Sequence, residues 1–193
     1  MKNLFLSTSM LAALLCQGCA TSLALPDRVS YSSEKAFTDK MPTLEKIVIS
    51  GNPANRQIFV SKAASSVCGS AHTSTFNVGE VFNLYLEQLS KASGTSCKTN
   101  CIIVEITIES VDIDYSLDCM RGKIDAGSFR ATLVYRINNI NGSTTNQKMT
   151  YAAKEEQINN EQNANFLFPI TKSIENVVVQ SMTDALKIGL PVK

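Results

Sequence analysis

The 193 residues have the length of one domain, and 44% of them are hydrophobic, enough for a hydrophobic core. Eighteen basic residues nearly balance seventeen acidic ones, and no cluster of five or more Lys and Arg occurs. This balance excludes bulk electrostatic attraction to nucleic acid or to anionic lipid. The chain holds one histidine, which argues against histidine-based catalysis and against a multi-histidine metal site.

The first residues have the layout of an export signal. Lys2 precedes an apolar run from Leu4 to Leu15, shorter than the roughly 20 residues that span a bilayer. The small residues around Cys19 follow, with Gly18 before it and Ala20 after it. This arrangement resembles the lipobox of bacterial lipoproteins. The resemblance implies cleavage before Cys19, acylation of Cys19 (palmitate) and, because Ala20 is not aspartate, transfer to the outer membrane.

Two alternatives to lipidation remain open from the sequence. The first is an ordinary secretory signal, cut after Ala20 or after Ala24, which would make the protein periplasmic or secreted. The second is a redox pair formed by Cys16 and Cys19, although such pairs accompany a βαβ pattern. On the lipoprotein interpretation, Cys16 is lost with a signal peptide of residues 1–18.

The residues after the predicted anchor are rich in serine, threonine and charge and show no sustained periodicity. We therefore predict that residues 19–44 comprise the lipidated Cys19 and a flexible tether, followed by a periplasmic domain at residues 45–193. The domain is predicted to begin with two short strands, Lys46–Ser50 and Arg56–Lys62, separated by a Gly-Asn-Pro turn.

The clearest pattern of secondary structure in the sequence is that of a helix. A loop is predicted for residues 63–75, and apolar residues then recur at helical spacing from Val78 to Leu89. Asn77 is expected to cap this helix, with Glu80 as its capping-box partner.

Three strands are predicted next. Apolar and polar residues alternate from Cys101 to Ser116, and the alternation changes phase at Ser110, which predicts a β-bulge or a bend. A second alternating strand covers Phe129 to Ile137, and Asn141-Gly142 predicts a hairpin turn before a return strand through Met149–Ala153. The acidic residues of the first strand are expected on its solvent-exposed face: Glu105, Glu109, Asp112 and Asp114.

The last predicted element is a helix that begins near Pro169 and ends at Gly189. A polar loop, Glu155 to Asn165, precedes it. The order of elements predicts an α+β fold, a two-layer sandwich in which two helices pack on one face of an antiparallel sheet. The other face of the sheet is expected to be open to water or to a partner.

Four cysteines follow the predicted cleavage site, and an oxidising periplasm predicts two disulfides among them. The first helix is about 22 Å long, so a strand running back along it returns Cys119 toward Cys68. Cys97 and Cys101 both lie at the far end of that helix. The predicted pairs are therefore Cys68–Cys119 and Cys97–Cys101. A four-cysteine zinc site and free thiols remain as alternatives, although these four cysteines lack the paired CxxC spacing of such sites.

Motifs for catalysis are missing from the sequence. It contains no phosphate-binding loop and no HExxH, GxSxG or dinucleotide fingerprint. His72 lies in a serine-rich stretch and is expected to be a solvated loop residue. The sequence therefore predicts a protein that is not an enzyme and that uses no cofactor and no metal.

The order and spacing of the elements predicted for residues 78–188 resemble those of a known family. These elements are the helix VGEVFNLYLEQLSKAS, the strand IIVEITIESVDIDYS, the hairpin FRATLVYRINNINGSTTNQKMTYAAK and the helix ITKSIENVVVQSMTDALKIGL. This layout resembles the YajG-like family of small outer-membrane lipoproteins of Gram-negative bacteria. It is also similar to LptE-like lipoproteins, which assist lipopolysaccharide insertion, and to auxiliary lipoproteins of lipid-transport ABC systems.

These observations lead to two main functional hypotheses. The first is a lipid-anchored, non-enzymatic envelope protein that contacts an unidentified envelope protein at the periplasmic face of the outer membrane. The alternative is an accessory lipoprotein that binds or transports lipid or lipopolysaccharide, for which Arg130 and Arg136 on one strand face are the hint. An enzyme or an inhibitor with a disulfide-braced loop is a third possibility, and no partner nucleic acid is expected.

Overall fold

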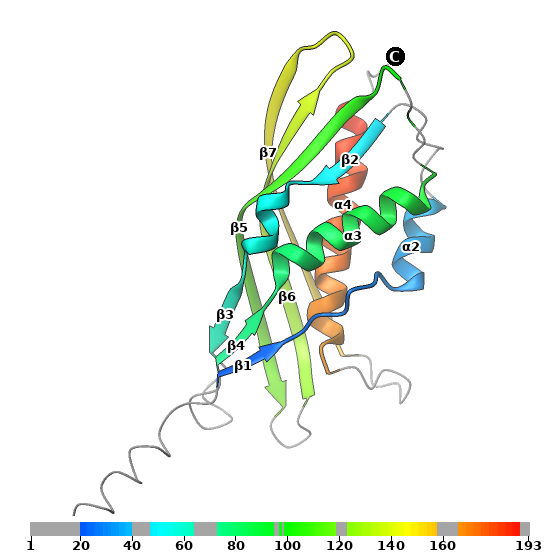
Figure 1. The fold of residues 1–193 in the computed structure, drawn as a ribbon. Helices are drawn as coiled ribbons and strands as arrows, with labels where there is room; N and C mark the ends of the chain where they lie inside the picture. Colours follow the sequence, from blue (N-terminus) through cyan, green and yellow to red (C-terminus); the bar gives the residue numbers. More distant parts are fainter. Residues whose placement is uncertain are drawn as a thin grey trace, which may run out of the picture.

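A computed structural model of the protein describes residues 20–39, 47–63, 73–94, 97, 99–118, 123–157 and 166–189 (Figure 1). A four-stranded sheet forms one layer, and two long helices cover one of its faces. The elements in chain order are β1 (Ala20–Leu23), α2 (Tyr31–Thr38), β2 (Ile47–Gly51), the 3-10 helix η1 (Pro53–Gln57), β3 (Val60–Ala63), β4 (Thr73–Phe76), α3 (Val78–Ala92), β5 (Ile102–Asp118), β6 (Lys123–Asn138), β7 (Thr144–Glu156) and α4 (Phe168–Gly189).

The main sheet has the strand order β2-β5-β6-β7 and confirms the predicted α+β class. β5, β6 and β7 form the expected antiparallel meander. β2 differs from the prediction, because it pairs with β5 in parallel. Parallel neighbours require a crossover connection, and α3, which lies between β2 and β5 in the chain, provides it.

The core lies between this sheet and the two helices. The inward residues of β5 change from even to odd numbers, since Ile106 and Ile108 are buried before the bulge and Ile113 after it. The register shift falls between Ile108 and Ser110, which confirms the phase change read from the sequence. α4 contributes an apolar stripe whose fully buried members include Ile170, Ile174, Val177, Val178, Met182 and Ala185.

A buried asparagine continues the hydrogen bonding of β5 where its pairing with β2 ends. Asn55 of η1 is 1% exposed. Its Nδ2 donates to the Ile106 carbonyl oxygen at 3.0 Å, and its Oδ1 accepts from the Ile108 amide at 2.9 Å. β2 ends at Gly51, opposite Ile106, so the Asn55 side chain bonds backbone groups of β5 at the point where its pairing with β2 stops. Gly79 of α3 packs so closely that a Cβ there would overlap the Asn55 carbonyl oxygen.

A second, smaller sheet has the order β1-β4-β3. β4 begins within the stretch predicted as a loop, so that prediction is wrong for residues 73–75. β4 is only four residues long and mostly polar (TSTF), which leaves little local pattern to detect. It is held from both sides, in parallel by β1 and antiparallel by β3.

The segment 20–39 corrects the prediction of a flexible tether. It forms β1 and α2, and its side chains Leu25, Val29 and Phe37 are buried in the core. We call residues 20–39 the N-terminal segment. Its few apolar residues do not follow one helical or strand period, which is why the sequence pattern suggests a tether.

The expected capping box of α3 is also wrong. Asn77 makes no side-chain hydrogen bond to its own helix. Its Oδ1 instead accepts from the Leu25 amide at 3.3 Å, so this residue holds the N-terminal segment. The predicted hairpin turn is confirmed, since Gly142 adopts φ +80° and its amide donates to the Asn139 carbonyl oxygen at 2.9 Å.

Candidate functional site

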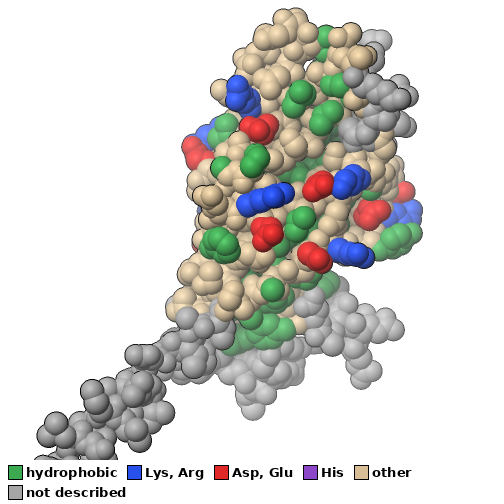
Figure 2. All heavy atoms as spheres, viewed as in Figure 1, with side chains coloured by type: hydrophobic (Ala, Val, Ile, Leu, Met, Phe, Trp, Pro, Cys, Tyr) green, Lys and Arg blue, Asp and Glu red, His purple; other side chains and the backbone are tan. Residues whose placement is uncertain are grey.

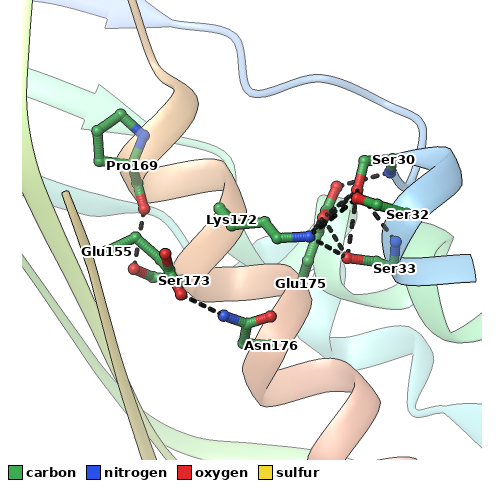
Figure 3. A network of polar contacts seen from close by, with 9 residues as sticks. All are labelled: Ser30, Ser32, Ser33, Glu155, Pro169, Lys172, Ser173, Glu175 and Asn176. Carbon is green, nitrogen blue, oxygen red and sulfur yellow. Dashed lines mark hydrogen bonds and ion pairs between the residues drawn. The ribbon is translucent and has the colours of Figure 1, made fainter. Parts of the chain in front are cut away.

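A group of hydroxyls, one lysine and one carboxylate joins the N-terminal segment to α4 (Figure 3). Glu175 is 2% exposed. Its Oε1 accepts from the Ser30 amide at 2.7 Å, and its Oε2 accepts from the hydroxyls of Ser30 and Ser33, each at 2.6 Å. Lys172 adds an ion pair at 3.2 Å. We call Ser30, Ser33, Lys172 and Glu175 the Glu175 cluster.

The chemistry of the Glu175 cluster is that of structural hydrogen bonding. A serine–lysine pair acts as nucleophile and base when a neutral amine takes the hydroxyl proton. Lys172 Nζ lies 2.6 Å from Ser33 Oγ, but it also forms the ion pair with Glu175. The Ser33 hydroxyl donates to Glu175, and Ser33 is 4% exposed. These contacts cap the start of α2 with a carboxylate from another helix.

The N-terminal segment is also bonded to α3. The Tyr85 hydroxyl donates to the Pro26 carbonyl oxygen at 2.8 Å. Gln88 donates to the Asp27 carbonyl oxygen at 2.6 Å and accepts from the Val29 amide at 3.0 Å. Burial raises the pKa of Tyr85, and the nearby carboxylates of Glu175 and Asp27 add to this shift. The segment is therefore fastened to both helices by polar as well as apolar contacts.

Two tyrosines connect the main sheet to α4. The Tyr135 hydroxyl donates to the Tyr151 hydroxyl at 2.7 Å, and Tyr151 lies within hydrogen-bonding distance of Asp184 at 3.2 Å. Burial raises the pKa of Tyr135, and burial is also the main cause that raises the pKa of Tyr151 to about 12. Both hydroxyls are therefore protonated donors at neutral pH.

The raised pKa values of the buried tyrosines predict that the protein loses stability in alkali. The pKa values of Tyr85, Tyr135 and Tyr151 are raised above the value of about 10 in an unfolded chain. Their contribution to stability is fully present below about pH 10 and is lost as the pH rises through the folded values. We expect the urea midpoint to fall steeply between about pH 10 and pH 12. Tyr135→Phe should flatten this fall, and a midpoint that stays constant in alkali would contradict the assignment.

The face of the main sheet that points away from the helices, which we call the open face, carries the acidic residues that the sequence singles out. Glu105 lies opposite Arg136, and Asp112 lies opposite Arg130, in the β5–β6 register. Glu109 pairs with Lys148 at 2.5 Å and Asp114 with Lys62 at 3.1 Å. Each carboxylate therefore has a basic neighbour, as expected of a solvated sheet face.

Arg130 and Arg136 are the residues whose charge favours lipopolysaccharide binding in the sequence. In the structure, acidic residues on the neighbouring strand offset both charges. A hollow of about 370 Å³ lies on the open face and includes Asp112, Arg130, Ala152 and Lys154 in its lining. On the side of the molecule seen in Figure 2, basic and acidic side chains are likewise interspersed, and neither sign gathers into one patch. Charge thus favours partners with mixed charge over polyanions.

One disulfide lies within the described residues, between Cys97 and Cys101, whose Cα atoms are 5.9 Å apart. This is one of the two pairs that the sequence predicts. The other pair, Cys68–Cys119, lies outside the described residues, as do His72 and the lipidation site Cys19. These three assignments stay predictions.

A cluster of metal ligands and a bilayer-spanning helix are both absent from the described residues. In that part of the chain, no three His, Cys, Asp or Glu side chains come close enough together to hold a metal ion. None of the described helices combines the length and the hydropathy that a bilayer-spanning helix needs.

Comparisons with known proteins give similarities of fold only. No protein-family model and no curated protein sequence matches the chain. Among solved structures, rare lipoprotein B from Shewanella oneidensis is 5% identical and covers 74% of this chain and 92% of its own, with a TM-score of 0.37. A protein from Xanthomonas campestris is 10% identical and covers 86% and 92%, with a TM-score of 0.47.

A minor lipoprotein from Acinetobacter baumannii is 11% identical and covers 75% of this chain and 91% of its own, with a TM-score of 0.34. At these identities and TM-scores, the similarity assigns the chain neither to a family nor to an activity.

Proposed function

We propose that this chain is a lipid-anchored, non-enzymatic accessory protein of the bacterial envelope, held at the outer membrane through Cys19 and acting by protein–protein contact. The observation that carries the proposal is the position of β1. Ala20, the residue after the predicted anchor, already pairs with Thr73 of β4. An acylated Cys19 would therefore hold the folded domain close to the bilayer, with no long tether between them.

This attachment would fix the orientation of the domain. β1 pairs with β4, and Ser74 of β4 lies 3.2 Å from the Tyr115 hydroxyl near the end of β5. The β6–β7 hairpin lies at the opposite end of the long strands (Figure 1). The membrane would adjoin the first end, so the open face and the β7 edge would extend away from the bilayer toward soluble or membrane-bound partners.

The outer edge of β7 is the strongest candidate contact surface. β7 is an edge strand of 13 residues, and its register with β6 is continuous. Backbone hydrogen bonds join Ser143 to Asn139 and Gln157 to Asp125, at the two ends of β7. By the alternation of antiparallel ladders, the even-numbered residues between them direct their N–H and C=O groups outward. Such an edge can accept a strand from a partner.

The geometry favours a different protein over a second copy as the partner. Two β7 edges related by a two-fold axis would pair antiparallel. The two copies would then carry their Cys19 anchors at opposite ends of the joined sheet. Because β1 begins directly after Cys19, both anchors would not reach one membrane surface. We therefore propose that β7 and the adjoining open face dock an extended segment of another envelope protein.

Site-specific photo-cross-linking tests this contact. Benzoylphenylalanine at Thr150, an exposed β7 residue, is expected to cross-link an envelope protein in intact cells. The matched control is the same replacement at Gln180, which is exposed on α4 on the other side of the sheet. Equal cross-linking at both positions, or cross-linking at Gln180 alone, would refute docking at β7.

A further inference from the structure

The small sheet β1-β4-β3 has a side that packs on the core and a side that is exposed. Three side chains in one row of its register pack into the core: Leu23, Phe76 and Val60. Because side chains alternate along a strand, the neighbouring row points away from the core: Ser22, Thr75 and Ser61. Ser22 and Ser61 are exposed, and Thr75 is half-buried.

Phe59, the residue directly before β3, extends this exposed side. Its neighbours Ile58 and Val60 pack against the core, whereas Phe59 itself is 60% exposed. The alternation therefore places Phe59 on the same side as Ser61. These side chains form what we call the small-sheet face: Ser22, Phe59, Ser61 and Thr75. A contact that covered Phe59 would gain the free energy of burying an aromatic ring.

The small-sheet face carries no charge, and two of its hydroxyls bond to each other. Ser61 Oγ and Thr75 Oγ1 lie 2.9 Å apart in a hydrogen bond, which lowers the cost of taking them out of water. Lys62, the charged residue of β3, belongs to the next row of the register and forms an ion pair with Asp114 at 3.1 Å. The open face of the main sheet differs, because it carries carboxylates and basic side chains along its length. Charged side chains are costly near hydrocarbon, so the small-sheet face suits contact with lipid better than the open face does.

β1 brings the predicted anchor close to this face. Ala20 follows Cys19 in the sequence and pairs with Thr73 of β4. Thr73 in turn pairs with Ala63, at the end of β3. Phe59 lies four residues before Ala63. The spacings of residues along a strand and of neighbouring strands therefore put Phe59 about 16 Å from Ala20. A bilayer that holds the acyl chains of Cys19 can thus also reach the small-sheet face.

We infer that the small-sheet face lies on the surface of the lipid bilayer, with the Phe59 ring inserted at the boundary between headgroups and acyl chains. Aromatic side chains favour that boundary, and the hydroxyls of this face would lie among lipid headgroups that can hydrogen-bond to them. The contact would add a second attachment to the anchor and stop the domain from turning about Cys19. It rests on the acylation of Cys19 proposed above and goes beyond it, because an anchor alone does not select the face that meets the membrane.

Fluorescence quenching by brominated lipids tests this contact. The chain contains no tryptophan, so a single introduced tryptophan reports on its own surroundings. Full-length acylated protein is reconstituted in vesicles of phosphatidylethanolamine and phosphatidylglycerol, with and without bromine on the acyl chains. The emission of Phe59→Trp and Ser61→Trp should shift to the blue on reconstitution, and the brominated lipid should quench most of it. Both positions are exposed, so both variants are expected to fold.

Ser116→Trp is the matched control for Ser61→Trp. Ser116 is also exposed and lies near the same end of the molecule, next to Tyr115, whose hydroxyl contacts β4, but it belongs to the open face. Ile140→Trp is the control at the β6–β7 hairpin, where Ile140 is 55% exposed. Neither control should show more than slight quenching.

Two results would overturn the inference while the chain still sediments with the vesicles, so that the anchor itself stands. The first is quenching of Phe59→Trp and Ser61→Trp that does not exceed that of Ile140→Trp. The second is equal quenching of Ser61→Trp and Ser116→Trp, because the strand ends and not the small-sheet face would then meet the lipid. A chain that fails to sediment with the vesicles would instead contradict anchoring through Cys19, and this orientation with it.

Discussion

Glu175→Ala is expected to lower the free energy of unfolding by about 3–5 kcal/mol, the usual effect of breaking a buried ion pair by removing one partner. The substitution leaves the Ser30 amide and the hydroxyls of Ser30 and Ser33 without their acceptor. It also leaves Lys172, whose side chain is only 21% exposed, without its counter-charge. The N-terminal segment should then separate from α4. Urea unfolding followed by circular dichroism measures the loss.

Asp39→Ala is the matched control for this prediction. Asp39 forms an ion pair with Lys35 in the same N-terminal segment, but both side chains are more than half exposed. Exposed pairs of this spacing contribute about 0.3–0.5 kcal/mol. If Glu175→Ala were as mild as Asp39→Ala, the Glu175 cluster would not be what fastens the segment to the domain.

Gly79→Ala is expected to destabilise the fold by about 3 kcal/mol, at the upper end of the range for overpacked cores. A Cβ at this position would overlap the Asn55 carbonyl oxygen and lie 2.6 Å from the Asn55 carbonyl carbon. Both are backbone atoms, so the clash cannot be relieved by a rotamer change. Alanine in place of glycine favours a helix by only about 1 kcal/mol, so the clash outweighs this gain. The relaxation should displace Asn55 from its hydrogen bonds to the β5 backbone.

The same substitution at Gly142 provides the comparison. A Cβ at Gly142 would meet nothing within 4 Å, and its cost comes only from the positive φ of the hairpin turn. We expect a loss of about 1 kcal/mol, the usual penalty for alanine in the left-handed region. A Gly79→Ala protein as stable as the wild type would mean that α3 does not pack against η1 as described.

Helices and strands whose apolar residues recur at a regular spacing could be predicted from the sequence. α3 and α4 show helical stripes, and β5 shows both its alternation and the phase change at the bulge. The hairpin follows from Asn141-Gly142. In each case, neighbouring residues along the chain determine the structure, so a local pattern is sufficient.

The N-terminal segment could not be predicted in this way, because its contacts are with residues far away in the chain. The Ser30 amide bonds to Glu175 across 145 residues, and the Tyr85 hydroxyl reaches Pro26 across 59. No local window contains both partners of such a bond. The parallel pairing of β2 and the short strand β4 were missed for the same reason.

One sequence feature nevertheless indicates the Glu175 cluster. Glu175 lies at helical spacing with Val178 and Met182, so it sits on the apolar side of α4. A carboxylate on such a face requires buried donors, and the Ser-rich stretch near Ser30 offers them.

The most direct test of the central claim, a lipid-anchored protein whose anchor is Cys19, is metabolic labelling with radioactive palmitate followed by membrane fractionation. The wild-type chain is expected to carry the label and to sediment with the outer membrane. Cys19→Ala should lose the label and leave the membrane or stay unprocessed, whereas Cys16→Ala, the control within the predicted signal, should keep it. A Cys19→Ala chain that is processed, labelled and still found in the outer membrane would contradict the account.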